Sequence, residues 1–301
     1  MRICPHCELS APDLVMEVLA QARLAVDHGF DGITLAEPPG SFAAYQPDPV
    51  QLAGWLLADM PAGWVAPGPL VLPLRAARLV AGDVARLGVR FPGRVGVGVA
   101  AGAIPADLAL LGAPTGGLTH RFARGLAQLA AALRAAAEDP AGGAVGGAPV
   151  PSAAGSPVPL ISSAANVRAA RLAARHGTGL AVEASAAPGW IRQLTRAYRA
   201  AGGPGPVCIT CAVWLGSPSP AWLDSRCGEA IATADADELA CRVAAAVWVS
   251  GAESVSLRVH EAGVAPDMAR DQIIRLGQEV LPRLRRAIAP VAGHAGLPDV
   301  S

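Results

Sequence analysis

Lysine is absent from this sequence, so all 24 of its lysine-or-arginine positions are arginines. They are matched by 24 acidic residues. Only 16% of the side chains are charged and the formal net charge is zero. This balance excludes the basic surface that nucleic-acid-binding proteins need and gives no attraction to anionic lipid. The abundant alanine, glycine and proline are typical of GC-rich coding sequence, so we assign no function to the arginines as a class. A small neutral or modestly polar ligand is expected.

Long apolar runs are also missing. No stretch reaches the roughly 18 apolar residues of a membrane span, and the first residues lack the apolar core of a signal peptide. The sequence therefore predicts a cytoplasmic protein without membrane contact. The six cysteines are expected to be reduced in that compartment, so no disulfide framework is predicted.

Several catalytic motifs are absent. The chain has no Gly-x-Ser-x-Gly elbow, no phosphate-binding Walker loop and no His-Glu-x-x-His helix, which argues against hydrolase and kinase functions. Two Cys-x-x-Cys pairs occur, Cys4/Cys7 and Cys208/Cys211. Residues three apart on a strand point to opposite faces, and a redox pair needs a helix N-terminus. We therefore predict no metal site and no dithiol site.

What the sequence does contain is a regular alternation of short β-like runs and longer helical ones. This pattern indicates β-α units and a parallel sheet. The expected strands are 1–6, 31–36, 65–74, 94–100, 160–161, 179–182, 207–213 and 254–259, and the expected helices are 12–28, 49–58, 75–87, 119–137, 165–176, 189–201, 236–249 and 266–288. Eight units in 301 residues fit one α/β domain over residues 1–301, a (β/α)8 TIM barrel of about 250 residues with long loops.

Residues 140–159 contain only glycine, alanine, proline, serine and valine. They have too little bulk and periodicity to pack, so they are expected to form a mobile loop. In a barrel enzyme, such a loop often gates the site, and we expect the substrate to lie beneath it.

Short motifs in order along the chain resemble the bacterial luciferase-like family of flavin-dependent oxidoreductases. Residues 29–37 (GFDGITLAE) resemble the segment that closes the second strand of these proteins. Residues 93–112 contain the most specific match, GRVGVG followed by a Gly, Pro, Asp and Gly spacing. Arg121-Phe122, residues 159–179 and residues 279–284 (EVLPRL) resemble later family segments.

The resemblance implies a TIM barrel that uses reduced FMN. It implies that Leu72 and the segment Gly98, Val99, Ala100 and Ala101 lie against the flavin ring. The loop with Ser162, Ser163 and Asn166 would hold the flavin phosphate, because small residues at a helix N-terminus favour an anion. Ser163 and Asn166 are alternatively caps of the following helix, and one residue can serve both purposes.

Two positions depart from the family pattern. Pro38 stands where many relatives have a histidine after the second strand, and Ala101 stands where luciferase has an arginine for the phosphate. The catalytic candidates are therefore Glu37, His260 and His6, which end strands at the ligand-facing rim. Glu37 could carry protons, or it could form an ion pair with Arg75, and either histidine could line the pocket instead.

A separate acidic residue, Asp107, matches a family position on the turn after the fourth strand. We favour helix capping for it over a catalytic role.

The leading functional hypothesis is a monooxygenase of this family that acts on a small organic substrate with reduced FMN, supplied as a dissociable cosubstrate by a separate flavin reductase. The alternatives are deazaflavin-dependent hydride transfer on the same fold and a non-catalytic flavin-binding or partner subunit. The resemblance also suggests a homodimer through the helices that follow strands two and three.

Overall fold

The structure is a computed structural model. It describes residues 1–3, 11–37, 48–102, 108–109, 112, 114, 116–138, 144–145, 148–149, 158–184, 188–225, 230–259 and 264–289.

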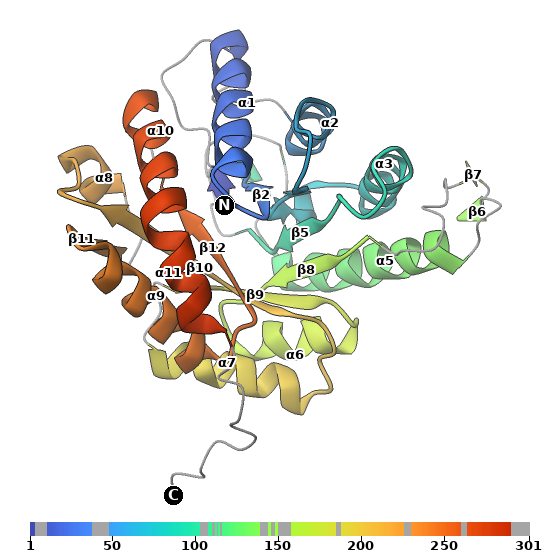
Figure 1. The fold of residues 1–301 in the computed structure, drawn as a ribbon. Coiled ribbons are helices and arrows are strands. Elements are labelled where there is room, and N and C mark those ends of the chain that lie inside the picture. Colours follow the sequence, from blue (N-terminus) through green and yellow to red (C-terminus); the bar gives the residue numbers. More distant parts are fainter. Residues whose placement is uncertain are drawn as a thin grey trace, which may run out of the picture.

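Parallel strands form one continuous sheet that is rolled into a barrel (Figure 1). The strands along its path are β3 (Trp64–Pro67), β2 (Gly32–Leu35), β1 (Arg2–Ile3), β12 (Ser254–Arg258), β10 (Val207–Leu215), β9 (Gly179–Glu183), β8 (Leu160–Ser163), β5 (Val97–Ala100) and β4 (Leu70–Val71). Each expected strand has a counterpart in this list. Short strands rich in valine, isoleucine and leucine are favoured where both faces are covered.

The two ends of this path, β3 and β4, are halves of the expected third strand, interrupted at Gly68-Pro69. The amide of Val65 donates to the carbonyl of Arg94 at 2.8 Å, and the amide of Gly96 donates to the carbonyl of Val65 at 3.0 Å. These bonds join the third strand to the segment before β5, so eight strand positions follow one another around the barrel among the described residues. The predicted (β/α)8 TIM-barrel fold is confirmed.

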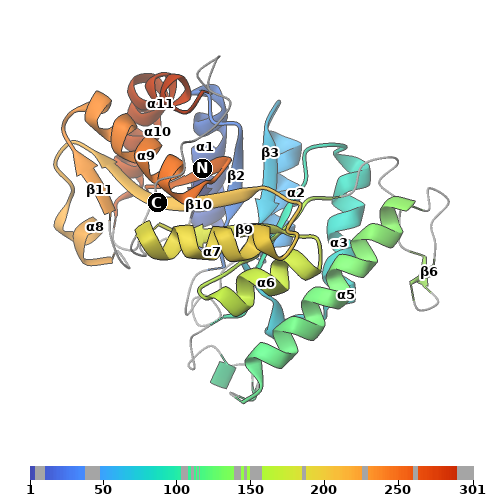
Figure 2. The ribbon, with the colours of Figure 1, turned by 90° about the horizontal axis from the view of Figure 1, so that it is seen from below.

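Helices surround the sheet, as Figure 2 shows from below. They are α1 (Ala11–Asp27), α2 (Pro49–Asp59), α3 (Ala77–Arg90), α5 (Leu118–Glu138), α6 (Val167–Arg175), α7 (Pro188–Ala200), α9 (Ala236–Ser250), α10 (Pro266–Arg275) and α11 (Leu281–Ile288). A π-helical turn over Leu276–Val280 joins the last two, where one helix was predicted. Buried side chains such as Leu126, Leu180 and Ile209 fill the layer between strands and helices. No helix in the described ranges is long and apolar enough to cross a bilayer.

Two elements were not expected from the sequence. Strand β10 continues past the barrel and pairs with β11 (Ala230–Thr233), and a short helix, α8 (Pro220–Ser225), precedes that strand. The rings of Trp214 and Trp222 lie 5.5 Å apart in a small apolar cluster here. Aromatic burial beside the barrel therefore holds an extension that the alternating pattern did not reveal.

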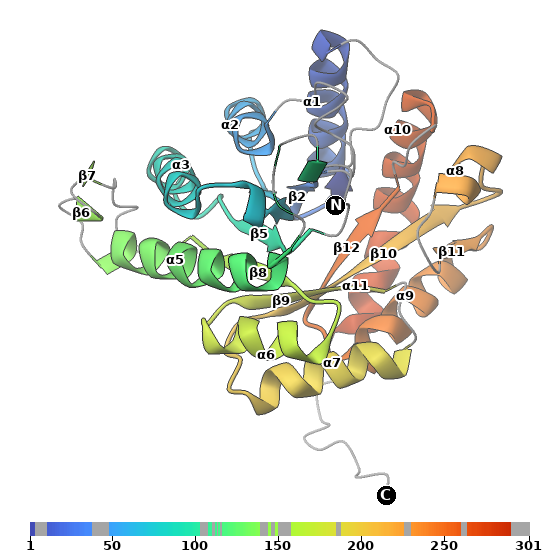
Figure 3. The same cartoon turned by 180° about the vertical axis from the view of Figure 1, so that it is seen from behind.

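The expectation for residues 140–159 needs correction. Strands β6 (Ala144–Val145) and β7 (Ala148–Pro149) pair antiparallel within this segment, and the other residues between 139 and 157 lie outside the described part. The segment follows α5 and leads into β8, so it is a helix-to-strand connection. Such connections lie at the N-terminal side of the strands, and Figure 3 shows β6 and β7 beyond the end of α5. The hairpin of β6 and β7 therefore lies away from the C-terminal ends of the strands, and the rest of the expected mobile loop up to residue 157 lies outside the described residues.

Candidate functional site

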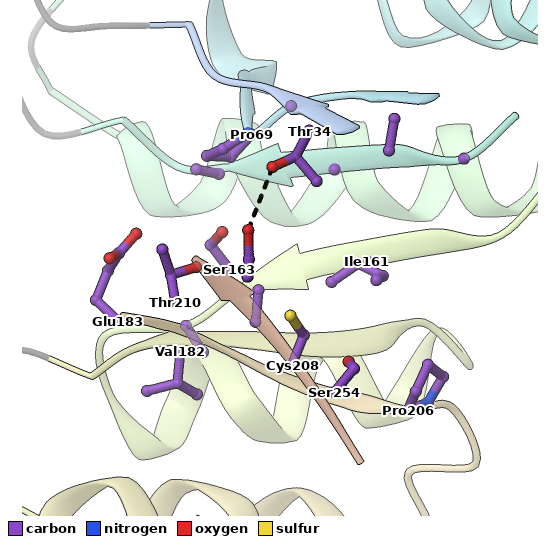
Figure 4. Close-up of a pocket in the computed structure, with 18 of the residues that line it drawn as sticks. Thr34, Pro69, Ile161, Ser163, Val182, Glu183, Pro206, Cys208, Thr210 and Ser254 are labelled. Atoms are coloured by element: carbon purple, nitrogen blue, oxygen red, sulfur yellow. Dashed lines mark hydrogen bonds between the residues drawn. The ribbon is translucent and has the colours of Figure 1, made fainter. Parts of the chain in front are cut away.

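A cavity of about 2360 Å³ runs through the middle of the barrel, and its lining reaches the carboxyl ends of the strands. This is the position of the active site in TIM-barrel enzymes. Figure 4 shows side chains from opposite sides of the barrel pointing into the cavity. The site can therefore be built from alternate residues of each strand, because successive side chains of a strand point to opposite faces.

The inward side chains are unusually small for a barrel of this type. The cavity is lined by Gly32, Thr34, Ala66, Gly68, Gly96, Gly98, Ile161, Ser163, Ala181, Glu183, Cys208, Thr210, Ser254 and Ser256. Barrels of this class usually fill their interior with valine, isoleucine and leucine in layers. Here only Ile161 in that set is a branched aliphatic residue, which accounts for the cavity.

Polarity changes along the strands. At their carboxyl ends, the inward positions include Ser163, Thr210 and Ser256, and the Oγ atoms of Thr34 and Ser256 lie 3.4 Å apart (Figure 4). Two residues earlier on these strands, Ile161, Cys208 and Ser254 occupy inward positions. Hydroxyl groups are thus more frequent at the carboxyl ends, where Thr34, Ser163, Thr210 and Ser256 lie.

Backbone without side chains, at Gly68 and Gly98, forms one wall of the cavity at the carboxyl ends of the strands, called the glycine wall below. A Cβ atom added to Gly68 would lie 2.5 Å from the carbonyl oxygen of Gly98, so a side chain at position 68 would displace β5. Gly98, Ala100 and Ala101 all line the cavity, as expected for a surface that meets a flat ring.

Two neighbours of this wall do not line the cavity. Val99 alternates outward and is fully buried, and Leu72 starts a 3-10 turn and lies under Gly125 of α5. Their expected contact with a flavin ring is therefore not supported.

The N-terminus of α6 borders the cavity beside the glycine wall, because α6 follows β8 and β8 pairs with β5. Ser163 points inward at the end of β8, and Asn166 caps the helix by accepting a hydrogen bond from the amide of Ala169 at 2.9 Å. Asn166 also lines the cavity, so capping leaves it beside any bound anion. The first amides of a helix have no partner within the helix and attract negative charge.

Ser162 is on the other face of β8. It is fully buried, it is not part of the cavity lining, and its hydroxyl has no hydrogen-bond partner among the described residues. Its side chain therefore points away from the cavity, because one step along a strand reverses the direction of the side chain. The predicted cofactor contact of Ser162 stays a prediction.

Basic side chains that the sequence analysis did not select also line the cavity. They include His120 near the start of α5 and Arg168 and Arg171 on α6, and these three are exposed. Arg168 and Arg171 are three residues apart, a spacing that puts them on one face of the helix. The sequence signal that could have identified these two arginines is their spacing next to the expected phosphate loop. These groups offer positive charge that Ala101 does not.

Glu37 is held in an ion-pair network. One carboxylate oxygen accepts from the amide of Val71 and the other from the guanidinium of Arg75, both at 2.6 Å, and Arg75 also binds Asp48 at 2.6 Å. Burial lowers the pKa of Arg75, but the attraction of Glu37 and then Asp48 outweighs it and raises that pKa above its usual value. Glu37 is not part of the cavity lining. The ion pair weighed as the alternative is what the geometry shows, and proton transfer by Glu37 has no support in it.

The other predicted candidates divide into two groups. His6, His260, Pro38, Asp107 and the Cys4/Cys7 pair lie outside the described residues. The second cysteine pair is described, and its members point in opposite directions.

Cys208 lines the cavity, whereas Cys211 is buried in the outer core. Burial raises the pKa of the Cys208 thiol and raises that of Cys211 to about 12, so neither is a thiolate near neutral pH. No group of three metal-binding side chains occurs within the described ranges.

Solved structures with this fold were found at low sequence identity. The monooxygenase RslO1 from Streptomyces bottropensis matches with a TM-score of 0.75 and 18% identity, covering 91% of this chain and 95% of that chain. The oxygenating constituent of 3,6-diketocamphane monooxygenase from Pseudomonas putida, in complex with FMN, matches with a TM-score of 0.73 and 13% identity over 94% and 97%.

An F420-dependent secondary alcohol dehydrogenase, in complex with an F420-acetone adduct, matches with a TM-score of 0.67 and 17% identity over 94% and 98%. No curated protein sequence matches this chain. The family model described as luciferase-like monooxygenase matches residues 3–273, which is most of the 301 residues. The chain therefore belongs to the luciferase-like monooxygenase family.

Proposed function

We propose that this protein is a monooxygenase that uses reduced FMN, delivered by a separate flavin reductase, to oxidise a small organic substrate in the barrel cavity. The observation that carries the proposal is that a helix N-terminus and a wall of bare backbone lie side by side on the lining of one cavity. The first suits a phosphate and the second suits a flat ring. Membership of the family supplies the reaction class.

The residues present fit FMN. Ser163, the first amides of α6 and Arg168 would hold the phosphate, because all of them border the cavity at the same helix end. Gly98 and Ala100 would face the ring, since no side chain larger than a methyl group projects there. When bound, reduced FMN supplies the electrons for the activation of oxygen.

The chain's own contribution is to bind, orient and exclude water. The hydroxyls of Thr34, Thr210 and Ser256 would orient a polar group of the substrate at the carboxyl ends of the strands. The apolar lining beyond them limits access of water, which protects a reactive flavin from side reactions. Among the described histidines, His120 lines the cavity, but it lies near the start of α5 and not on a strand. Proton transfer near the ring is therefore not assigned to a described residue.

Activity with a flavin reductase tests the proposal. Purified protein should quench FMN fluorescence on binding, and it should increase oxygen consumption when a reductase supplies reduced FMN. Protein that neither binds FMN nor consumes oxygen under these conditions would contradict the proposal. Binding of FMN without oxygen consumption would support the non-catalytic flavin-binding subunit instead.

Deazaflavin-dependent hydride transfer is the second candidate. It is favoured by the structural similarity to an F420-dependent secondary alcohol dehydrogenase, which has nearly the same coverage as the FMN complex. The two cofactors differ in their need for oxygen. Turnover of an alcohol or carbonyl compound with F420 under strict anaerobiosis would favour this candidate over the monooxygenase.

A negative charge introduced at position 166 tests the phosphate site. Aspartate caps a helix as well as asparagine does, so Asn166→Asp should preserve α6 while adding a negative charge beside the expected phosphate. We expect FMN affinity to fall by about tenfold or more, since charged hydrogen bonds are worth about 1.5 to 3 kcal/mol. Riboflavin, which lacks the phosphate, is the control ligand. An equal loss of affinity for FMN and for riboflavin would show that the phosphate binds elsewhere.

A further inference from the structure

Three helices that follow one another around the barrel carry an excess of positive charge. The helices α5, α6 and α7 contain three arginines each, α6 and α7 contain no acidic residue, and α5 contains one, Glu138, at its last position. Figures 1 and 2 show these helices along one side of the molecule. We call their nine arginines the basic sector. The rest of the sequence has 15 arginines and 23 acidic residues, so the charges of this neutral chain are unevenly distributed.

Little of the positive charge in the basic sector is neutralised locally. Of the nine arginines, Arg199 alone forms an ion pair with an acidic side chain in the described part of the chain, and its partner is Glu253. Arg134, for example, donates instead to the carbonyl of His176, which carries no net charge. Eight of the nine arginines are exposed. Exposed charges add little to the stability of a fold, but they set the electric field in the solvent around it.

The basic sector extends to the lining of the cavity. Arg168, Arg171 and Arg175 all border the cavity, and with a rise of 1.5 Å per residue they lie within about 12 Å of the N-terminus of α6 along the helix axis. This distance is close to the Debye length of about 10 Å at 0.1 M salt. At the carboxyl ends of the strands, the described lining contains one acidic side chain, Glu183. The arginines outnumber it, so the field at this end of α6 attracts anions.

We propose that the basic sector attracts small dianionic ligands, phosphate monoesters in particular, to the α6 end of the cavity and accelerates their association. For FMN, this inference rests on the proposed function. Charges at the rim of a site change the association rate more than the dissociation rate, because they act on the free ligand before contact. The basic sector therefore affects how fast a ligand arrives, whereas Ser163 and the first amides of α6 would hold it once it is bound.

Association kinetics with FMN test the proposal, measured from the quenching of flavin fluorescence in a stopped-flow instrument. The test variant is Arg124→Glu/Arg175→Glu, which reverses two exposed charges of the basic sector outside the expected phosphate contacts. At 0.1 M salt, its association rate should be about threefold to fivefold lower than that of the wild type, with the dissociation rate unchanged within about twofold. In 1 M salt, where the Debye length is about 3 Å, this difference should disappear. An unchanged association rate, or a change confined to dissociation, would overturn the proposal.

Two controls separate the basic sector from the net charge and from misfolding. Arg90→Glu/Arg286→Glu changes the net charge by the same amount on α3 and α11, and it should preserve the association rate of FMN. Riboflavin lacks the phosphate, so both double variants should bind it at the wild-type rate. Equal slowing of FMN in the two double variants would overturn the proposal, as would equal slowing of riboflavin and FMN in Arg124→Glu/Arg175→Glu.

The field is also measurable without flavin, from the NMR relaxation of protein protons by an anionic and a cationic nitroxide of the same size. In the wild type, we expect the anionic nitroxide to relax protons of α6 and α7 about twofold more strongly than the cationic one, and we expect this ratio to fall toward one in Arg124→Glu/Arg175→Glu. Equal relaxation by both nitroxides in the wild type would overturn the proposal whether or not FMN binds. A positive field in a protein that does not bind FMN would support the attraction of anions and contradict the proposed function.

Discussion

At the scale of single residues, Glu37 is a position where the structure decides between two roles that the sequence allowed. It ends a buried strand at the ligand-facing rim, where the sequence allowed either a proton carrier or an ion pair with Arg75. In the structure, one carboxylate oxygen accepts a hydrogen bond from the Arg75 guanidinium and the other accepts one from the Val71 amide. The local pattern could not decide between the two, because the partners are 34 and 38 residues away.

We predict that Glu37→Gln destabilises the fold rather than changing a catalytic pH profile. The glutamine can still accept from Val71, but Arg75 loses its buried countercharge, so the free energy of unfolding should fall by about 1 to 3 kcal/mol. Denaturant unfolding measures this change. Asp48→Asn is the matched control, since Asp48 is more exposed and asparagine preserves its helix cap. Unchanged stability in Glu37→Gln, together with a shifted pH profile of activity, would restore the catalytic assignment.

Ser162 and Ser163 show that the sequence alone did not predict which of two neighbouring side chains points into the cavity. The sequence placed both beside the helix start of α6, and the structure brings Ser163 to the edge of the cavity. Which serine points inward depends on the register of β8 with β5 and β9. Register is set by the whole sheet, so a short strand with polar residues on both faces does not reveal it.

At the scale of elements, alternation of strands and helices was predictable because each element repeats one pattern of buried residues. The elements that were missed, β11 and α8, belong to an extension held by Trp214 and Trp222. The hairpin of β6 and β7 within residues 140–159 was not expected either. Composition predicts a loop, but only the order of elements says at which end of the barrel the loop lies.

Tyr198 joins two elements and gives a prediction about pH. Its buried hydroxyl donates to the carbonyl of Thr178 at 2.6 Å and accepts from the amide of Gly205 at 2.9 Å, which connects α7 to the residues that precede β9 and β10. Burial raises the pKa of this phenol, and the carbonyl of Gly205 and Arg199 lower it by less. In the unfolded chain the phenol ionises at about pH 10, so the unfolded state loses its proton first.

It follows that Tyr198 contributes stability that is present below about pH 10 and is lost as the pH rises through the folded-state value. Tyr198→Phe should lower the free energy of unfolding by about 1 to 2 kcal/mol at neutral pH, because partners of the hydroxyl become unsatisfied. The gap between wild type and variant should narrow above pH 10. A constant gap across this range in thermal or denaturant unfolding would contradict the assignment.

At the scale of the whole molecule, the family and the fold are shown, whereas the assembly remains a prediction. The expected homodimer uses α2 and α3, and exposed apolar side chains lie on both: Trp55 on α2 is 41% exposed and Leu79 on α3 is 69% exposed. Exposed apolar surface of this kind marks interaction sites when it is contiguous.

We expect Leu79→Glu to convert the dimer into a monomer, as measured by size-exclusion chromatography with light scattering. A charge placed in an apolar interface is costly unless it is paired. Met16→Glu on α1, where the side chain is 65% exposed, is the matched control and should leave the assembly unchanged. Monomeric wild-type protein, or a dimer that persists in Leu79→Glu, would rule out this interface.

The central claim is that the barrel cavity holds FMN between the start of α6 and the glycine wall of β5. A crystal structure of the protein soaked with FMN tests it most directly. We predict that the phosphate lies within hydrogen-bonding distance of Ser163 and the first amides of α6, with the ring against Gly98 and Ala100. A cavity that remains empty at saturating FMN, or a phosphate bound away from α6, would contradict the claim.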